Sequence, residues 1–272
     1  MTNQPKKNTS DHKLPRRRFL QSGAAAVAGL WITSGYASGA ESPNDKVNVA
    51  CIGIGAQGRS NVNGVANQNI VGLCDVDDVR AGDAYQKFPK AKKYYDFRQM
   101  LDEMDNQIDA VTVSTPDHTH AHIAVRAMRM GKHCYCEKPM AHSVSEVRLM
   151  TEIAREKKLA TQLGMQRHVK DNMHRVFEIV QSGVIGEVRE VFCRMGGDRG
   201  MPDMPTQFPP VPEHLKWDLW LGPAMDRPYS PDYCPYNWRF WWDFGTGETG
   251  NWACHILDIP YTSLKLGHPI KV

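Results

Sequence analysis

Between residues 47 and 164, short apolar runs alternate with longer segments of mixed polarity. Residues 120–130 carry apolar side chains at helical spacing, and Ser143 with Glu146 three residues later matches a capping box that begins a helix. The apolar runs have the length of buried strands, and they cover residues 47–54, 70–74, 108–113, 132–136 and 160–163. Strands that alternate with helices predict an α/β fold with a doubly wound parallel sheet.

Beyond about residue 168 the pattern changes. A predicted helix at residues 174–181 is followed by a β-rich run at 188–193, a long proline-rich irregular stretch at 196–236 and a helical pattern at 250–266. Such a long irregular stretch is usually functional. Its many tryptophans would serve equally well to stack on sugar faces or to form a core. We therefore expect a Rossmann-type domain at residues 46–167 and a second domain at residues 168–272.

The first forty residues have the layout of an export signal. Arg16, Arg17 and Arg18 precede an apolar run at residues 23–32 and small residues at 37–40. Paired arginines before such a run are typical of the twin-arginine type, and the run is too short for a stable membrane span. We predict a signal peptide over residues 1–40, a linker at 41–45 and a periplasmic protein; a membrane tether or disordered tail is the alternative.

Composition excludes some classes of function. The net charge of +3 is small and much of the excess base lies in the N-terminal segment, so nucleic-acid binding is not expected. The chain has seven cysteines, an odd number that gives no disulfide framework, and most of them lie in apolar runs, so we expect buried reduced thiols. Histidines and carboxylates lack metal-ligand spacing, and no metal is predicted.

A glycine-rich turn follows the first predicted strand. Gly53, Gly55 and Gly58 would allow a tight turn and a close approach of the backbone to a pyrophosphate. Asp75 ends the next strand, where it would accept hydrogen bonds from ribose hydroxyls and repel a 2′-phosphate, so NAD is favoured over NADP. Arg59 keeps NADP open, and a purely structural turn is the alternative. Further cofactor contacts are expected from the neighbouring residues Ile54, Gln57 and Arg59.

A second loop follows the strand at residues 108–113. Loops at the carboxyl ends of parallel strands form the ligand crevice. Cofactor contacts are therefore predicted for four residues of this loop: Ser114, Thr115, Pro116 and His120. His120 would alternatively cap or pack the following helix, and the neighbouring His118 is as easily an exposed loop histidine.

Two further segments carry candidate catalytic residues. Lys138 follows the strand at residues 132–136, where it could stabilise an alkoxide-like oxygen and have its pKa lowered by burial. Glu137 and Lys138 are also counted as cofactor contacts, although a surface pair of Glu137 with Lys138 is the alternative. His255 is a candidate general base, with Asn251 one helical turn before it; a buried structural histidine is the alternative.

These motifs together resemble the Gfo/Idh/MocA oxidoreductase family over residues 46–258. The resemblance implies a Rossmann domain, a second α/β domain with an open, mainly antiparallel sheet, tightly bound NAD or NADP, and sugar or cyclitol substrates. It also implies that Lys138 is the catalytic lysine and that His255 is the family's later histidine. Asn251 stands where the family often has an aspartate, so no carboxylate there supports an imidazolium. Family members usually extend further, and an incomplete second domain is therefore expected.

The sequence thus predicts an exported NAD(P)-dependent oxidoreductase that transfers a hydride between nicotinamide and a sugar or polyol. One alternative is an NAD-dependent glycosidase that oxidises, eliminates and reduces in turn. Another is a non-catalytic protein that binds a dinucleotide or a sugar. The expected partner is a small molecule, with a homo-oligomer possible, and no stable membrane span is predicted.

Overall fold

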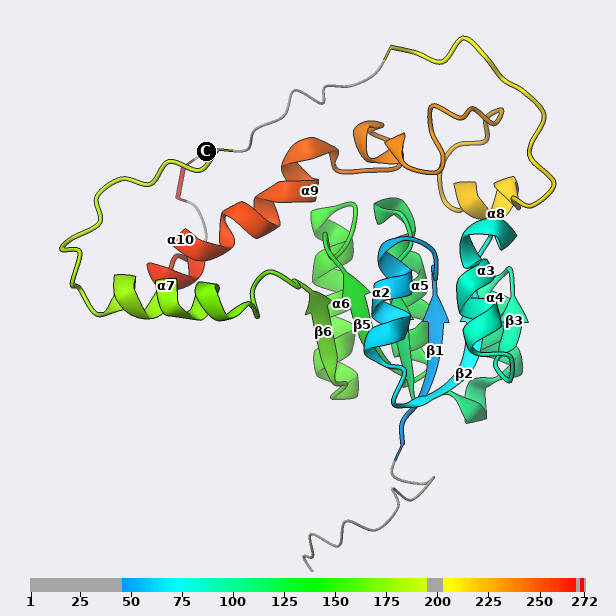
Figure 1. The fold of residues 1–272 in the computed structure, drawn as a ribbon, viewed down its shortest axis with the longest axis horizontal. Helices are drawn as coiled ribbons and strands as arrows, with labels where there is room; N and C mark the ends of the chain where they lie inside the picture. Colours follow the sequence, from blue (N-terminus) through cyan, green and yellow to red (C-terminus); the bar gives the residue numbers. More distant parts are fainter. Residues whose placement is uncertain (1–45, 195–202, 268–269, 272) are drawn as a thin grey trace, which may run out of the picture. The chain divides into compact units, whose positions relative to one another are not determined.

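The computed structural model describes residues 46–194, 203–267 and 270–271. Six parallel strands form one sheet in the order β3-β2-β1-β4-β5-β6 (Figure 1). The strands are β1 (Asn48–Ile52), β2 (Asn69–Cys74), β3 (Lys92–Tyr94), β4 (Ala110–Val113), β5 (His133–Glu137) and β6 (Thr161–Gly164). The strand order reverses between β1 and β4, which is the Rossmann arrangement with its crevice at that point. The predicted α/β, doubly wound sheet is confirmed.

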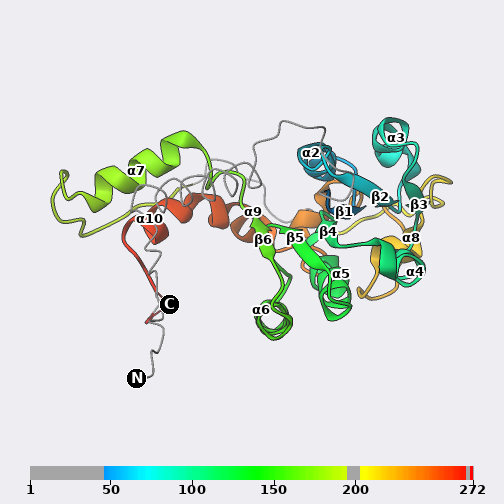
Figure 2. The ribbon, with the colours of Figure 1, turned by 90° about the horizontal axis from the view of Figure 1, so that it is seen from below.

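Helices cover both faces of this sheet. Figure 2 shows α2 (Gln57–Gly64) and α3 (Asp78–Lys87) on one face, and α4 (Phe97–Glu103), α5 (Asp117–Arg129) and α6 (Val144–Lys157) on the other. Alternate residues of a strand point to opposite faces. Accordingly Val49 and Cys51 of β1 pack toward α2 and α3, while Ala50 and Ile52 pack toward α4, α5 and α6. Two apolar cores therefore hold the sheet between its helices.

Local signals explain where several elements begin. Ser143 and Glu146 form the expected capping box, with the Glu146 carboxylate accepting from the Ser143 N–H at 2.8 Å. Asp77 caps α3 by accepting from the N–H groups of Val79 and Arg80, each at 3.0 Å. The hydrophobic pattern did not predict α3 or β3, because α3 is mostly polar and β3 is an edge strand whose Lys92 is exposed.

The C-terminal part is built from helices and loops. It contains α7 (Asp171–Gln181), α8 (Trp217–Leu221), α9 (Gly247–Ile256) and α10 (Asp258–Ser263), with the 3₁₀ helix η3 (Asn237–Phe240) before α9. The predicted continuous helix at residues 250–266 is broken, because Pro260 lacks the N–H that would bond the Ile256 carbonyl and its ring would clash there.

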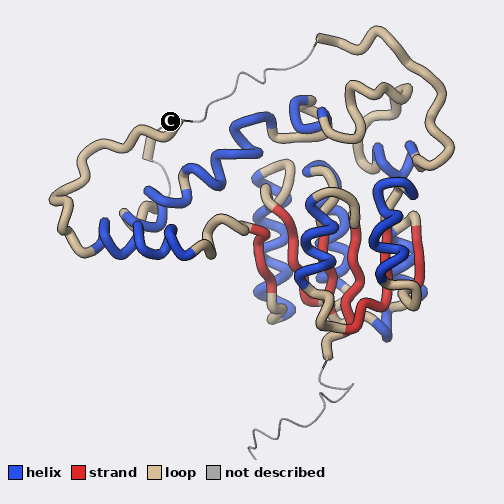
Figure 3. The backbone as a smooth tube through the Cα atoms, in the orientation of Figure 1, coloured by secondary structure: helices blue, strands red, loops and turns tan. Residues whose placement is uncertain are grey.

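The predicted strand at residues 188–193 is not formed. Within the described residues after β6, none belongs to a strand (Figure 3), so the expected antiparallel sheet is absent from this part of the chain. A strand needs a hydrogen-bonded neighbour to be stable, and none of the described segments pairs with this run. Its apolar side chains are correspondingly exposed, as Phe192 shows at 77%.

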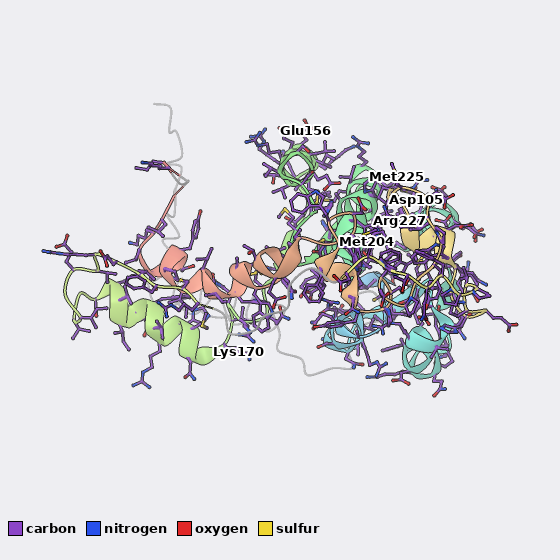
Figure 4. The ribbon with its side chains drawn as sticks, turned by 90° about the horizontal axis from the view of Figure 1, so that it is seen from above. Asp105, Glu156, Lys170, Met204, Met225 and Arg227 are labelled. Atoms are coloured by element: carbon purple, nitrogen blue, oxygen red, sulfur yellow. The ribbon has the colours of Figure 1, made fainter. Side chains whose placement is uncertain are left out.

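A third apolar core lies in the proline-rich region. Its buried members are Leu215, Trp217, Trp220, Leu221, Tyr233, Cys234, Trp238, Trp241 and Phe244. Arg227, labelled in Figure 4, stabilises this core. Its guanidinium pairs with Asp243 at 2.7 Å and lies 5.0 Å from the centre of the Phe244 ring. Most of the tryptophans of this region are thus core residues; their stacking on a sugar stays a prediction.

The cysteines are in the reduced state that the sequence predicted. All seven cysteines are free thiols, and five of them are buried. Burial raises the pKa of Cys134 to about 12, so that thiol stays protonated.

Among the described helices, none is both long and apolar enough to cross a bilayer.

Candidate functional site

A cavity of about 1190 Å³ opens at the carboxyl ends of the strands. It collects residues from the loops after β1, β2, β4 and β5, and residues from α9. Most of the residues proposed from the sequence line it: Gly53, Gly55, Gln57, Asp75, Ser114, Thr115, Pro116, Glu137, Lys138, Asn251 and His255. Four others, Ile54, Gly58, Arg59 and His120, lie outside its lining.

The glycine turn has the geometry of a dinucleotide cradle. Gly53 has a φ of +74°, and a Cβ there would lie 2.7 Å from the Ser114 carbonyl carbon. A Cβ on Gly58 would lie 1.8 Å from the Gly53 oxygen, so α2 could not pack against the turn with any larger residue. The bare backbone faces the cavity at the start of α2, where N–H groups and the helix dipole favour phosphate.

Asp75 fixes the shape of this turn. Its Oδ2 accepts hydrogen bonds from the N–H groups of Ile54 at 2.7 Å and Gly55 at 3.2 Å, and its Oδ1 accepts from Asp77 at 3.0 Å. Burial raises the pKa of Asp75, and these backbone bonds oppose the rise. Asp75 is nevertheless one of the lining residues of the cavity. The residues present therefore fit NAD: a glycine cradle for the pyrophosphate and an acid for the ribose.

Arg59 does not lie at this cradle. Its guanidinium pairs with Asp83 at 2.7 Å on the surface. Arg80 takes the place beside the turn instead, since a Cβ on Gly55 would lie 3.0 Å from the Arg80 Cβ. Sequence reasoning missed Arg80; the signal for it was its position in the first turn of a helix that begins at the same edge of the sheet.

The half-buried Asn61 and the buried His120 brace the loops after β4 and β5. Asn61 donates to the Ser114 hydroxyl at 2.8 Å and to Glu137 Oε1 at 2.9 Å. The ring nitrogens of His120 lie 2.8 Å from the Thr115 and Pro139 carbonyl oxygens. His120 therefore lies behind the loop, in the packing position that was its alternative, and its contact with a cofactor stays a prediction.

Lys138 points across the cavity to α9. Its ammonium donates to Asn251 Oδ1 at 2.7 Å and to the Asn251 carbonyl oxygen at 3.0 Å. It is therefore not a surface lysine paired with Glu137. Burial lowers the pKa of Lys138, and the positive charge of Arg239 adds to that effect. Desolvation thus favours loss of the Lys138 proton, as the sequence interpretation proposed.

His255 lies one turn further along α9 and is 8% exposed. Burial lowers its pKa to about 4, with further lowering by the charges of Lys138 and Arg167 and an opposing effect of Asp258. Its Nδ1 is buried and has no hydrogen-bond partner among the described residues. The imidazole is therefore neutral at pH 7 and has a lone pair that can accept a proton.

Asp117 and His118 attach residues 214–246 to the Rossmann domain. The His118 ring nitrogens lie 3.1 Å from the Trp220 carbonyl oxygen and 3.3 Å from that of Phe244. Asp117 accepts from the Thr246 hydroxyl at 2.8 Å. Burial lowers the pKa of His118 to about 4. His118 is thus a buried anchor rather than an exposed loop histidine, and sequence reasoning missed this role.

Residues 47–165 match the model of the Gfo/Idh/MocA oxidoreductase family for its NAD-binding Rossmann fold, and residues 198–268 match that of its C-terminal alpha/beta domain. Together these matches span well over half of the chain. The chain belongs to the Gfo/Idh/MocA oxidoreductase family. The predicted family and the predicted cofactor, NAD, are confirmed.

Several curated relatives are similar to parts of the chain. An inositol 2-dehydrogenase of Salmonella typhimurium is 27% identical over 161 residues, 57% of this chain and 47% of the relative. A levoglucosan dehydrogenase of Pseudarthrobacter phenanthrenivorans is 29% identical over 69% of this chain and 40% of the relative. A glycosyl hydrolase family 109 protein of Shewanella baltica is 32% identical over 65% of this chain and 45% of the relative. The chain spans less than half the length of these relatives.

Among solved structures, the myo-inositol 2-dehydrogenase from Lactobacillus plantarum is 25% identical, with a TM-score of 0.49 over 53% of this chain and 43% of that one.

Proposed function

We propose that this protein is an NAD-dependent oxidoreductase that transfers a hydride between nicotinamide and a sugar or polyol. One observation carries the proposal: Lys138, Asn251 and His255 lie on the same cavity as the glycine cradle and Asp75. Relatives named as inositol and levoglucosan dehydrogenases support the substrate class.

Each residue has a separate task. Bound NAD supplies an acceptor for the hydride that leaves the substrate carbon. Lys138, held by Asn251, donates a hydrogen bond to the substrate oxygen and stabilises its developing negative charge. His255, neutral at pH 7, takes the hydroxyl proton. The C–H electron pair and the O–H proton thus leave together, and the carbon–oxygen bond becomes a carbonyl.

The test follows NADH formation at the wavelength of reduced nicotinamide while a panel of sugars and polyols is added to the protein with NAD. Lys138→Ala and His255→Ala should each lower kcat/KM by about 10²- to 10⁴-fold. Lys157→Ala, at an exposed position at the end of α6, is the matched control and should behave like the wild type. Unchanged turnover by Lys138→Ala would remove Lys138 from the mechanism.

A second candidate is the NAD-dependent glycosidase, favoured by the similarity to the family 109 protein. It uses the same cofactor and the same proton acceptor, but the oxidised sugar is reduced again after the aglycone leaves. Release of free sugar from a glycoside without net NADH would establish it. Binding of NAD without turnover of any sugar or glycoside would favour the non-catalytic alternative.

Export through a twin-arginine signal belongs to the same proposal. It is supported by Arg16, Arg17 and the apolar run after them, which lie outside the described residues. Replacing both arginines by lysine should leave the protein in the cytoplasmic fraction; unchanged recovery in the periplasmic fraction would contradict this.

A further inference from the structure

One end of the cavity is strongly cationic. We call it the substrate end and define it by the lining residues Lys138, Arg167, Arg239, Asn251, Trp252 and His255. Three of these six are cations and none is an acid. The charges act on one another, since Lys138 and Arg167 both lower the pKa of His255 and Arg239 lowers that of Lys138.

Three carboxylates act on Lys138 or His255 through their charge, and all three are hydrogen-bonded inside the protein. Asp117 accepts from the backbone N–H and the hydroxyl of Thr246, at 3.2 and 2.8 Å. Glu137 accepts from Asn61 at 2.9 Å and from the Tyr135 hydroxyl at 3.2 Å.

The third carboxylate, Asp258, pairs with His168 at 2.9 Å and accepts from Thr262 at 3.2 Å. Within the described part of the chain, no carboxylate forms an ion pair with Arg167.

Arg167 has the geometry of a prepared anion site. Its guanidinium carbon lies 4.7 Å from the centre of the Trp252 ring. The Trp252 ring in turn meets His255 edge-on, with ring centres 5.9 Å apart. Stacking on an aromatic face fixes the guanidinium plane and leaves the N–H groups at its edge to bind a planar anion through two parallel hydrogen bonds.

We propose that Arg167, stacked on Trp252, binds a carboxylate of the substrate, so that the substrate class is an acidic sugar such as a uronic or aldonic acid. This inference rests on the proposed function. A carboxylate fits the site better than a phosphate because the planar guanidinium of Arg167 matches a planar carboxylate through two parallel hydrogen bonds. Two of the three Lys138 N–H donors go to Asn251, and the third is the one assigned to the reacting oxygen of the substrate. A carboxylate bound to Arg167 would also offset the positive charge of Arg167, which lowers the pKa of His255.

The experiment measures binding to the protein loaded with NADH by titration calorimetry. The probes are pairs of matched configuration: D-glucuronate with D-glucose, D-galacturonate with D-galactose, and D-gluconate with D-glucitol, with glucose 6-phosphate added as a phosphate probe. The acid of at least one pair should bind at least about tenfold more tightly than its neutral partner, as a charge-assisted bidentate contact requires.

Three variants test whether Arg167 causes the preference for the acid. Arg167→Gln should remove the preference, a loss of about 10- to 100-fold in affinity for the acid, and Arg167→Lys should retain part of it. Arg175→Gln, an exposed arginine of α7 outside the cavity, is the matched control and should retain all of it. The NADH affinity should be the same in every variant.

Four results would overturn the inference: no acid preferred in any pair, a preference that survives Arg167→Gln, tighter binding of glucose 6-phosphate than of every acid, or an Arg167→Gln protein that loses NADH affinity instead. Failure of the proposed function is distinct, because it shows as absent NADH binding or absent hydride transfer with every sugar and polyol. Hydride transfer with neutral sugars, together with no preference for any acid, would contradict this inference and leave the proposed function standing.

Discussion

His118 should contribute stability in a way that depends on pH. In His118→Ala, the Trp220 carbonyl loses its buried donor, which costs about 1–3 kcal/mol. The ring also loses its contacts with Trp220 and Phe244, at centroid distances of 5.5 and 5.2 Å, worth about 0.5–1.5 kcal/mol each. Partial collapse of the site offsets some of this loss, so we expect the free energy of unfolding to fall by about 3 kcal/mol at pH 7.5.

That difference should shrink in acid. The pKa of His118 is about 4 in the folded protein against 6.5 as the ordinary value, so the stability from its neutral form is present above pH 6.5 and is lost as the pH falls toward 4. A shift of that size corresponds to about 3 kcal/mol. The wild type and His118→Ala should therefore be nearly equal in stability at pH 4.

Urea unfolding followed by tryptophan fluorescence at pH 7.5, 6, 5 and 4 measures the difference. The exposed His122 of α5 provides the matched control, and His122→Ala should differ little from the wild type at any of these pH values. A destabilisation by His118→Ala that stays constant from pH 7.5 to pH 4 would show that His118 is not a buried neutral anchor.

Three other substitutions test separate parts of the structure. Asn251→Asp adds a negative charge beside Lys138 and should raise the pKa of His255, the proton acceptor, by about one unit. The acidic limb of the pH profile of kcat/KM should then move to higher pH, and an unmoved limb would contradict this. Gly58→Ala places a methyl group 1.8 Å from the Gly53 oxygen and should abolish NADH binding, measured by the fluorescence of bound NADH; wild-type NADH affinity would contradict the role assigned to this turn. Ser143→Ala should lower the unfolding free energy by about 1 kcal/mol in urea with NADH affinity retained; a cost near zero would mean that the cap is dispensable.

The inner strands β1, β2 and β4 of the Rossmann half were predictable because they are largely apolar runs, whereas the exposed edge strand β3 was not. A parallel strand buried on both faces has to be apolar throughout, and the β1 residues Val49 and Ala50 show this by facing opposite cores. The same logic failed at residues 188–193. That run has the composition of a strand, but a strand forms only with a hydrogen-bonded partner, and composition carries no information about whether the partner is present.

In the candidate site, too, some residues were predictable from the sequence and others were not. Gly53 and Asp75 were predictable because their conformation and position follow from the turn that joins a strand to a helix. The roles of His118 and Arg167 were not, because each depends on a contact with a segment far away in the sequence. His118 meets the Trp220 carbonyl 102 residues along the chain, and no local spacing encodes that distance.

Asn251 shows how one amide could change the electrostatics of the site. It joins Lys138 to α9 across 113 residues, and it does so without adding negative charge. The full charge of Lys138 therefore acts on His255, and with burial it keeps the imidazole neutral. A neutral imidazole can accept a proton, but a pKa of about 4 makes it a weak base near pH 7. An anionic group held by Arg167 would offset part of the positive charge and strengthen that base when substrate is bound. The carboxylate that Asn251 lacks would then come from the substrate.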